Sequence, residues 1–366
     1  MTHSEHNPPR DPKELYLSAP ALVLPGRRVD NDEVIERVRR NFRGSASQWR
    51  RIERKIRFAF DMSGSRYRYL DDESPQLSAA GYAAQAAGAC LAQQSVRSDT
   101  VDAVIFGAVC REYFEPATAF EVAAHAGILR PRMAFDVSNA CSGFLTAVQV
   151  FAGLTAIDPG LHTGLVCAAE GSGRQAHGQS WISYDIQRST DLDLLAAGLT
   201  IGNAAAAALV STLPPAWGAR IVGMETAARP EHYGLSVAHV NGVFECDSTG
   251  LFRETADYQP HIMALLDRLG WAPGDLDYIC IHQPSERVIT TLGQKFGATL
   301  DQLPLVHRYF GNTVSLSPIV PLHHLLQEGK VEPGMKIVLT AAAAGITMNS
   351  IALEWCPDRR QAAAGA

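Results

Sequence analysis

The feature that most constrains the fold is an alternation of short apolar runs with longer alanine-rich segments along the 366-residue chain. Apolar runs of this length are typical of strands buried on both faces, and their alternation with helices is typical of an α/β fold. In the first part of the chain we expect helices over 78–94 and 142–157, and strands over 102–106, 133–137, 164–169 and 204–210.

The second part of the chain repeats the scheme. We expect helices over 262–269, 285–296 and 316–327, and strands over 277–281, 336–340 and 350–355. The repeated order predicts two duplicated halves, 14–213 and 214–356, with the seam near Leu213-Pro214-Pro215. Residues 1–13 and 357–366 are expected to be flexible tails, and the polar segments 172–193 and 228–258 to be loops that cap a site.

Composition excludes several classes of function. The formal net charge is −6, which does not favour binding to nucleic acid or to a membrane surface. The chain has no run of 18 apolar residues, and its polar N-terminus has no secretory signal, so we expect a cytoplasmic protein. The seven cysteines form no CxxC pair, so no metal site is expected and most of them should be buried free thiols.

Arginine is concentrated between positions 27 and 68. One interpretation is a solvated helix face, partly paired with Glu33, Glu36 and Glu53. The other is a basic surface for the phosphates of coenzyme A or for an acidic carrier protein. The sequence leaves both open.

Cys141 is the candidate nucleophile. It follows the predicted strand MAFDV through a short turn, and the next predicted helix begins directly after it. At a helix start, unpaired N–H groups and the helix dipole favour a thiolate over a thiol. A cysteine in such a position can also be a small core residue, so the assignment needs partners.

Two candidate partners and one loop lie in the second half. His282 ends the strand DYICI, at the edge where α/β proteins bind ligands, and Asn312 lies in the loop YFGNT. A single histidine or asparagine in such a place can be merely structural. The small residues of 341–345 (AAAAG) predict a loop whose N–H groups could approach a ligand as an oxyanion hole.

Together, FDVSNACSGFL, IHQPSERVI, GNTVSLSPIVPL and AAAAGIT resemble the ordered active-site motifs of the ketoacyl synthase III group of thiolase-like condensing enzymes. The thirty residues between His282 and Asn312 also fit, and the resemblance extends from about Tyr16 to Trp355. It implies a five-layer α/β/α/β/α fold, a homodimer, and an acyl-thioester substrate carried by CoA or by an acyl carrier protein. It implies no metal and no tightly bound cofactor.

The resemblance also implies roles for residues. Cys141 would be acylated, while His282 and Asn312 would polarise the carbonyl of the second thioester. The N–H groups of Cys141 and Ala344 would form the oxyanion hole. A thiolate stores the acyl group as another thioester, and neutral N–H donors stabilise an enolate without adding charge.

One segment indicates a branch of the group. VCREYFEPATAF is similar to the corresponding stretch of OleA-type enzymes, which join two acyl chains head to head, and Glu115 matches their base. A malonyl donor loses CO2 and needs no base, whereas an unactivated donor does. Glu115 could instead cap a helix or pair with Arg111, and Glu112 is a nearby competitor.

The motifs depart from the usual pattern at three places: the alanines of 341–344, Asn203-Ala204 after Gly202, and Pro284-Ser285 after Gln283. These changes suggest a specialised substrate and a role in secondary metabolism. The sequence leaves three functions open. They are condensation, with a decarboxylative malonyl-dependent variant; transfer of the acyl group to a hydroxyl or amine; and a non-catalytic partner subunit.

Overall fold

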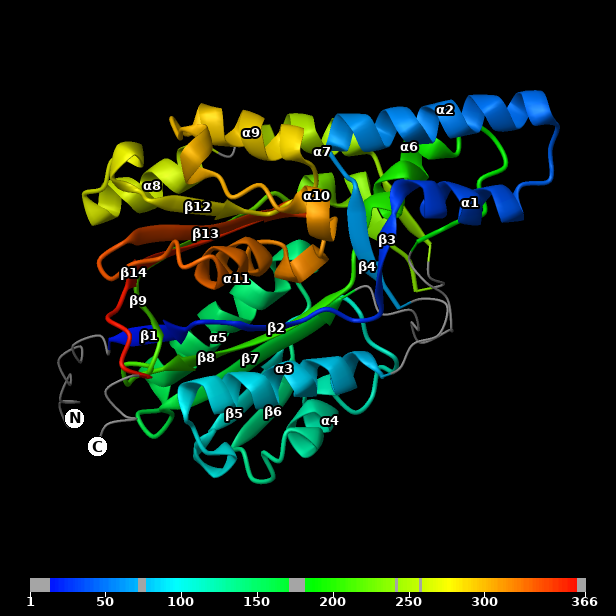
Figure 1. Cartoon of the computed structure of the whole chain (residues 1–366). Coiled ribbons are helices and arrows are strands. Elements are labelled where there is room, and N and C mark those ends of the chain that lie inside the picture. Colours follow the sequence, from blue (N-terminus) through cyan, green and yellow to red (C-terminus); the bar gives the residue numbers. More distant parts are fainter. Residues whose placement is uncertain (1–13, 72–76, 171–181, 241–242, 257–258, 361–366) are drawn as a thin grey trace, which may run out of the picture.

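The computed structural model describes residues 14–71, 77–170, 182–240, 243–256 and 259–360. It contains two groups of strands, each covered by helices, with a helical layer between them (Figure 1). From top to bottom in that view the layers are α8/α9, one strand group, α11/α5, the other strand group, and α3/α4. The predicted five-layer arrangement is therefore confirmed.

Ten of the described strands form one hydrogen-bonded sheet, in the order β12-β13-β14-β9-β1-β8-β7-β5-β6, with β2 beside β8, while β3 pairs with β4 and β10 with β11. The C-terminal group comprises β9 (Gly218–Ala228), β12 (Tyr278–Ile281), β13 (Lys336–Ala343) and β14 (Thr347–Trp355). The N-terminal group comprises β2 (Ala21–Val23), β5 (Ala103–Phe106), β6 (Met133–Asp136), β7 (Thr163–Glu170) and β8 (Ala204–Ser211).

The short strand β1 (Leu15–Ser18) joins the two groups, because it pairs antiparallel with both β8 and β9. The proposed seam at 213–215 falls between β8 and β9, where the chain passes from one group to the other. Within the groups, β5 is parallel to β6 and β7, and β12 is parallel to β13. Parallel neighbours bring the C-terminal ends of these strands to one edge, where a site can form.

Two helices lie between the strand groups, α5 (Gly143–Ile157) and α11 (Ile319–Gln327). Phe144, Leu145 and Phe151 of α5 are fully buried in one apolar cluster with Leu322 of α11. Residues Ala140–Ile157 are long and apolar enough to cross a membrane by length and composition, but this segment includes the helix at the centre of the fold. The outer layers are α3 (Ala79–Gln94) and α4 (Thr118–His125) on one side, and α8 (Gln259–Leu269) and α9 (Glu286–Lys295) on the other.

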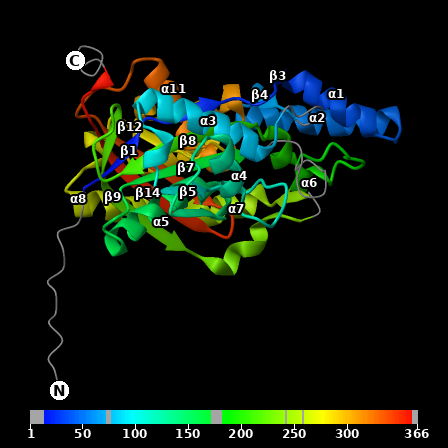
Figure 2. The ribbon, with the colours of Figure 1, turned by 90° about the horizontal axis from the view of Figure 1, so that it is seen from below.

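The arginine-rich segment forms a helical hairpin, α1 (Asn31–Asn41) and α2 (Ala46–Ser63), which projects beyond the sheets (Figure 2). Ser45 and Gln48 form a capping box at the start of α2, and Gly64 ends it in a left-handed conformation with φ 75°. Ile52, Ile56 and Phe60 repeat every four residues and bury one face of α2. The paired strands β3 (Arg27–Asp30) and β4 (Tyr67–Leu70) connect the hairpin to the body.

Five short elements complete the described helices and strands, around the same end of the molecule as the hairpin: α6 (Leu192–Leu195), α7 (Ser248–Thr255), α10 (His307–Phe310), β10 (Ser236–Ala238) and β11 (Phe244–Cys246).

One prediction about the active-site loop was wrong. The segment 341–345 is not a loop throughout, because Ala341–Ala343 continue β13 and pair with Thr347–Asn349 of β14. The turn is confined to residues 344–346, since pairing with β14 satisfies the backbone of the alanines before it.

Candidate active site

Cys141 lies in a 3₁₀ turn, Ala140–Ser142, between β6 and α5. Ala140 has a φ of 43°, a left-handed value that is uncommon for a residue with a Cβ atom. A Cβ on Gly143 would meet the carbonyl oxygen of Gly107 at 2.6 Å, so the loop after β5 lies directly against the nucleophile turn. The backbone after β5 therefore packs closely against the residue that follows this turn.

The protonation of Cys141 differs from the expectation. Burial, together with the Glu170 carboxylate and the Cys246 thiol, raises the pKa of the Cys141 thiol to about 12. The favourable effect of a helix start is outweighed by removal of the sulfur from water. Cys141 is therefore a neutral thiol in the resting protein, and it must lose its proton when a thioester is attacked.

Three segments that carry candidate residues meet at this turn. The turn Ala140–Ser142 packs against Val314–Leu316, which follows Asn312, and against β13. His282 lies beside β13, because its N–H donates to the carbonyl of Thr340 at 2.8 Å. The structure thus brings the segments of Cys141, His282 and Asn312 to one place, as the resemblance implies.

His282 is buried in an environment that keeps it neutral. Burial, together with the neighbouring His307, lowers its pKa to about 3. Its Nδ1 has no hydrogen-bond partner among the described residues. A protonated Nδ1 would need an acceptor there, so the arrangement favours the tautomer with the proton on Nε2.

Asn312 is fixed on both its backbone and its side chain. Its N–H donates to Thr200 at 2.8 Å, and its carbonyl accepts from Gly202 at 3.0 Å. Its Oδ1 accepts the N–H of Val314 at 3.0 Å, and Val314 has a left-handed φ of 51°. Such a conformation is strained for a β-branched residue, and it is held here by the surrounding packing.

The second proposed oxyanion donor, Ala344, lies in the turn between β13 and β14 and is half-buried. Because β13 contacts the turn that carries Cys141, Ala344 belongs to the same region. The Cys141 N–H interacts with its own sulfur.

Glu115 is placed differently from the other candidates. It is exposed on the loop between β5 and α4, and it has no hydrogen bond or ion pair in the part of the chain that the structure describes. It therefore neither caps α4 nor pairs with Arg111, which donates to Ala108 instead. Glu112 accepts the N–H of Ala79 at the start of α3, which is a structural role.

An apolar cluster surrounds the nucleophile. Cys141 packs against a cluster that includes Ile52 and Ile56 of α2, Leu199 and Val314. The cluster also receives Ile182, Ile186 and Leu192 from the first predicted cap segment, and Phe244 of the second packs against it. The part of 172–193 that precedes residue 182 lies outside the described residues. An apolar acyl chain would find matching surroundings here.

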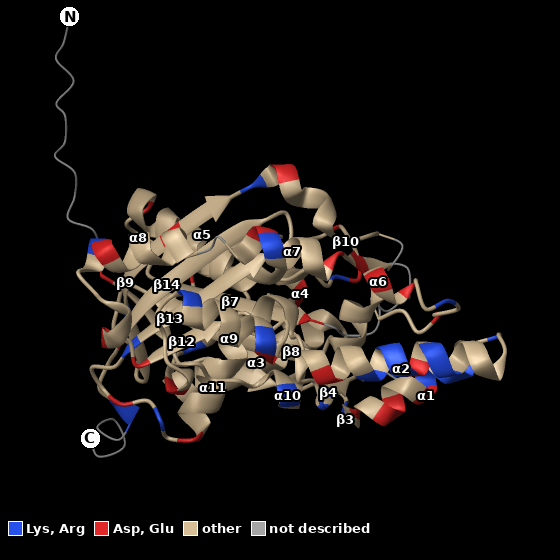
Figure 3. Ribbon diagram, turned by 90° about the horizontal axis from the view of Figure 1, so that it is seen from above, with Lys and Arg blue, Asp and Glu red and all other residues tan. Residues whose placement is uncertain are grey.

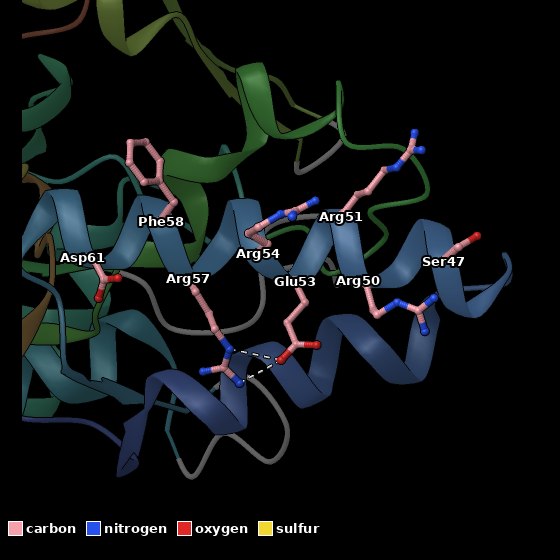
Figure 4. A pocket seen from close by; sticks show the side chains of 8 residues that line it. All are labelled: Ser47, Arg50, Arg51, Glu53, Arg54, Arg57, Phe58 and Asp61. Carbon is pink, nitrogen blue, oxygen red and sulfur yellow. Dashed lines mark hydrogen bonds and ion pairs between the residues drawn. The ribbon is translucent and has the colours of Figure 1, made fainter.

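The arginine-rich segment divides into three groups. Arg27 and Arg37 pair with Glu33, and Arg57 pairs with Asp32 and Glu53. Arg68 is not on a solvated face, because it is fully buried and donates to Asn31 and Ser65. Arg50, Arg51 and Arg54 are exposed on the outer face of α2, and Phe58 beside them is 62% exposed (Figures 3 and 4).

Sequence reasoning missed two buried groups beside the site. Glu170 is the last residue of the otherwise apolar strand β7. A carboxylate at the end of an apolar strand was the sequence feature that could have identified it. His307 is fully buried, and its Nδ1 lies 2.8 Å from the carbonyl oxygen of Gln283, next to His282. His307 precedes the GNT motif and had no signal of its own.

Known proteins share both the motifs and the fold. The family model described as 3-oxoacyl-[acyl-carrier-protein] synthase III C terminal matches residues 266–355. The beta-ketoacyl-[acyl-carrier-protein] synthase III of Pseudomonas aeruginosa is 26% identical over 305 residues, covering 80% of this chain and 86% of that one. Synthase III 3 of Streptomyces coelicolor is 28% identical over 348 residues, covering 93% and 96%.

By its C-terminal domain and its curated relatives, the chain is ketoacyl synthase III-like. It is therefore an acyltransferase of the 3-oxoacyl synthase type, and the reaction of this group is a Claisen condensation of acyl thioesters. This assignment agrees with the resemblance found in the four motifs.

Solved structures share the fold of this condensing enzyme. An OleA variant of Xanthomonas campestris with bound lauric acid and lauroyl-CoA has a TM-score of 0.82 at 23% identity, covering 94% of this chain and 100% of that one. The synthase III of Pseudomonas aeruginosa has a TM-score of 0.76 at 22% identity, covering 94% and 99%. Further OleA structures carry substitutions of a glutamate or a histidine.

Proposed function

We propose that this enzyme joins two acyl thioesters head to head through an acyl-Cys141 intermediate. The Cys141 sulfur forms a bond to the carbonyl carbon of the first thioester, and the carrier thiolate leaves with the proton that Cys141 gives up. The observation that carries the proposal is the meeting of the Cys141 turn with the segments of Asn312 and His282.

The second step needs an enolate of the second thioester. Nε2–H of His282 and Nδ2–H of Asn312 are the donors that would hold its oxygen, while the N–H groups of Cys141 and Ala344 hold the oxygen of the acyl-cysteine. The enolate carbon attacks the acyl-cysteine carbonyl, the new carbon–carbon bond forms, and the Cys141 thiolate is released. A neutral His282 suits this role because it donates without titrating near neutral pH.

Glu115 is our proposed base for the α-proton of the second acyl chain. A carboxylate with no partner among the described residues is free to accept a proton, and Phe114 beside it is 68% exposed. Phe120, two residues into α4, is 55% exposed. Exposed aromatic side chains flanking a carboxylate favour its insertion into another protein surface.

We therefore propose a homodimer in which Glu115 of one protomer serves Cys141 of the other. Mixed dimers test this arrangement. A Cys141→Ala protomer paired with a Glu115→Ala protomer contains one complete site only if the base acts across the interface. Product from the mixed dimer, with none from either parent homodimer, is expected. An inactive mixed dimer made from acylation-competent Glu115→Ala chains would place the base within one protomer.

A second, more specific proposal concerns the molecule that carries the acyl group. We propose that CoA or an acyl carrier protein delivers it, with no tightly bound cofactor, and that the outer face of α2 receives the acidic part of the carrier. Arg50, Arg51 and Arg54 have no acidic partner among the described residues, and the inner face of α2 contributes to the cluster around Cys141. Replacing the three arginines by Gln should raise KM for the carrier substrate and weaken its salt dependence, with kcat little changed.

We also propose how the chain is divided, where the protein acts and in what kind of pathway. The halves 14–213 and 214–356 are two duplicated units, of which the first supplies Cys141 and the second His282 and Asn312. The protein acts in the cytoplasm. The alanines at 341–344 and the other departures from the usual motifs suit a specialised biosynthetic pathway rather than the general initiation of fatty acids.

A further inference from the structure

A buried carboxylate, Glu170, stands between the nucleophile and the loop that carries Glu115. It is the last residue of β7 and has no exposed surface. Burying a carboxylate is unfavourable unless hydrogen bonds replace its water. Its place in the fold is therefore determined by the groups that it binds.

Those groups are two consecutive backbone amides of one loop. The N–H of Val109 donates to Oε1 at 2.9 Å, and the N–H of Cys110 donates to Oε2 at 3.1 Å. Each oxygen thus accepts one N–H, and burial raises the pKa of the Glu170 carboxyl. Val109 and Cys110 lie at the start of the loop that continues through Arg111 to Glu115.

The nucleophile lies on the other side. The end of the strand that carries Glu170 packs against Val314–Leu316, and that segment packs against the turn of Cys141. One buried side chain thus borders both the Cys141 turn, through Val314–Leu316, and the loop that leads to Glu115.

We propose that Glu170 is a positioning residue that fixes the loop of Glu115 by binding the Val109 and Cys110 amides. The inference rests on the proposed roles of Cys141 and Glu115.

Glu170→Gln replaces one of the two acceptor oxygens by an NH2 group with almost no change in size. The rate of Cys141 acylation should change little, because the substitution leaves the nucleophile in place. The condensation rate should fall about tenfold or more relative to the rate of Cys141 acylation, because the loop of Glu115 loses one of its anchors.

A matched control accompanies this experiment. Glu112→Gln alters a neighbouring carboxylate, which accepts the N–H of Ala79 at the start of α3, and its ratio of condensation to acylation should match that of the parent.

An unchanged ratio of condensation to acylation in folded Glu170→Gln overturns the proposal. If Glu170→Gln does not fold, Glu170→Asp keeps the carboxyl group on a shorter side chain. It should acylate Cys141 and lose condensation, and normal condensation by folded Glu170→Asp would contradict the proposal. Absence of acyl-Cys141 in the parent enzyme would instead refute the proposed function.

Discussion

The N–H of Val314 donates to Oδ1 of Asn312 at 3.0 Å, so the amide of Asn312 keeps its Nδ2–H group for a ligand. Asn312→Asp preserves the acceptor and removes the donor at nearly constant volume. We expect acylation of Cys141 to change less than about threefold, and condensation to fall at least about 100-fold, as for loss of one oxyanion donor. Single-turnover acylation by intact mass and product formation by mass spectrometry measure the two steps. Equal loss of both would indicate a folding effect instead.

Cys141→Ala should abolish the covalent acyl-enzyme. The thiol is the only side chain that we assign as nucleophile, and the apolar cluster around it accommodates a methyl group. Intact mass after incubation with an acyl-CoA measures the adduct, and Cys356→Ala, which removes a thiol remote from the site, should acylate normally. An adduct of undiminished occupancy in Cys141→Ala would overturn the nucleophile assignment.

The two buried histidines make stability depend on pH. Burial lowers the pKa of His282 to about 3 and that of His307 to about 4, from 6.5. Between pH 6.5 and 4 the unfolded chain binds protons at these positions that the folded protein does not. The free energy of unfolding therefore rises with pH in this window, by about 1.4 kcal/mol per pH unit for each histidine, and is lost on acidification.

Denaturant unfolding at pH 7 and pH 4.5 measures this dependence. His307→Asn should remove about half of the pH slope, although it lowers stability at pH 7 because the contact with Gln283 is lost. His162→Asn replaces an exposed histidine and should leave the slope unchanged. A slope that does not respond to His307→Asn would show that this histidine is not buried in its neutral form.

Gly202 is required by the close approach of two segments at the Asn312 loop. A Cβ at this position would meet the carbonyl oxygen of Phe310 at 1.9 Å. Gly202→Ala should therefore displace the loop and destabilise the protein by about 1–3 kcal/mol, with loss of condensation. Gly88→Ala, at an open and exposed position inside α3, should instead stabilise it by about 0.5–1 kcal/mol. Melting curves of both variants compare the two effects, and a neutral Gly202→Ala would refute the close approach.

The sequence predicted those helices and strands whose formation depends on a local sequence pattern. The apolar runs and alanine-rich helices placed β5, β6, β7, β12, α3 and α5 within a few residues of their observed limits. For the hairpin α1–α2 the sequence offered a solvated helix face as one interpretation, but it predicted neither the two helices nor the buried face of α2. Its signals were present in the Ser45–Gln48 capping box, in the spacing of Ile52, Ile56 and Phe60, and in Gly64.

What the sequence could not predict depends on contacts between distant segments. The strand β1 is four residues long and is defined by pairing with β8 and β9, some 200 residues away. Ala341–Ala343 became a strand because β14 extends to pair with them. Burial, which only the fold determines, outweighed the helix start at Cys141 and raised its pKa. The role of Glu170 could not be inferred either, because its partners Val109 and Cys110 lie 60 residues earlier.

Glu115→Gln should separate the two half-reactions. The variant keeps the size of the side chain but cannot accept the α-proton, so Cys141 should acylate at the parent rate while condensation of unactivated acyl thioesters stops. Glu112→Gln is the matched control and should retain both steps. Normal product formation by Glu115→Gln would show that Glu115 is not the base and has only a structural role.

The most direct test of the central claim is to incubate the purified enzyme with acyl-CoA or acyl carrier protein thioesters, first without and then with a malonyl thioester. Acyl-Cys141, CO2 and product mass are followed together. We predict acylation of Cys141 and a condensed product that contains two acyl chains, formed without malonyl thioester and without CO2. Product formed only with malonyl thioester and accompanied by CO2, or acylation with no condensed product under either condition, would contradict head-to-head condensation.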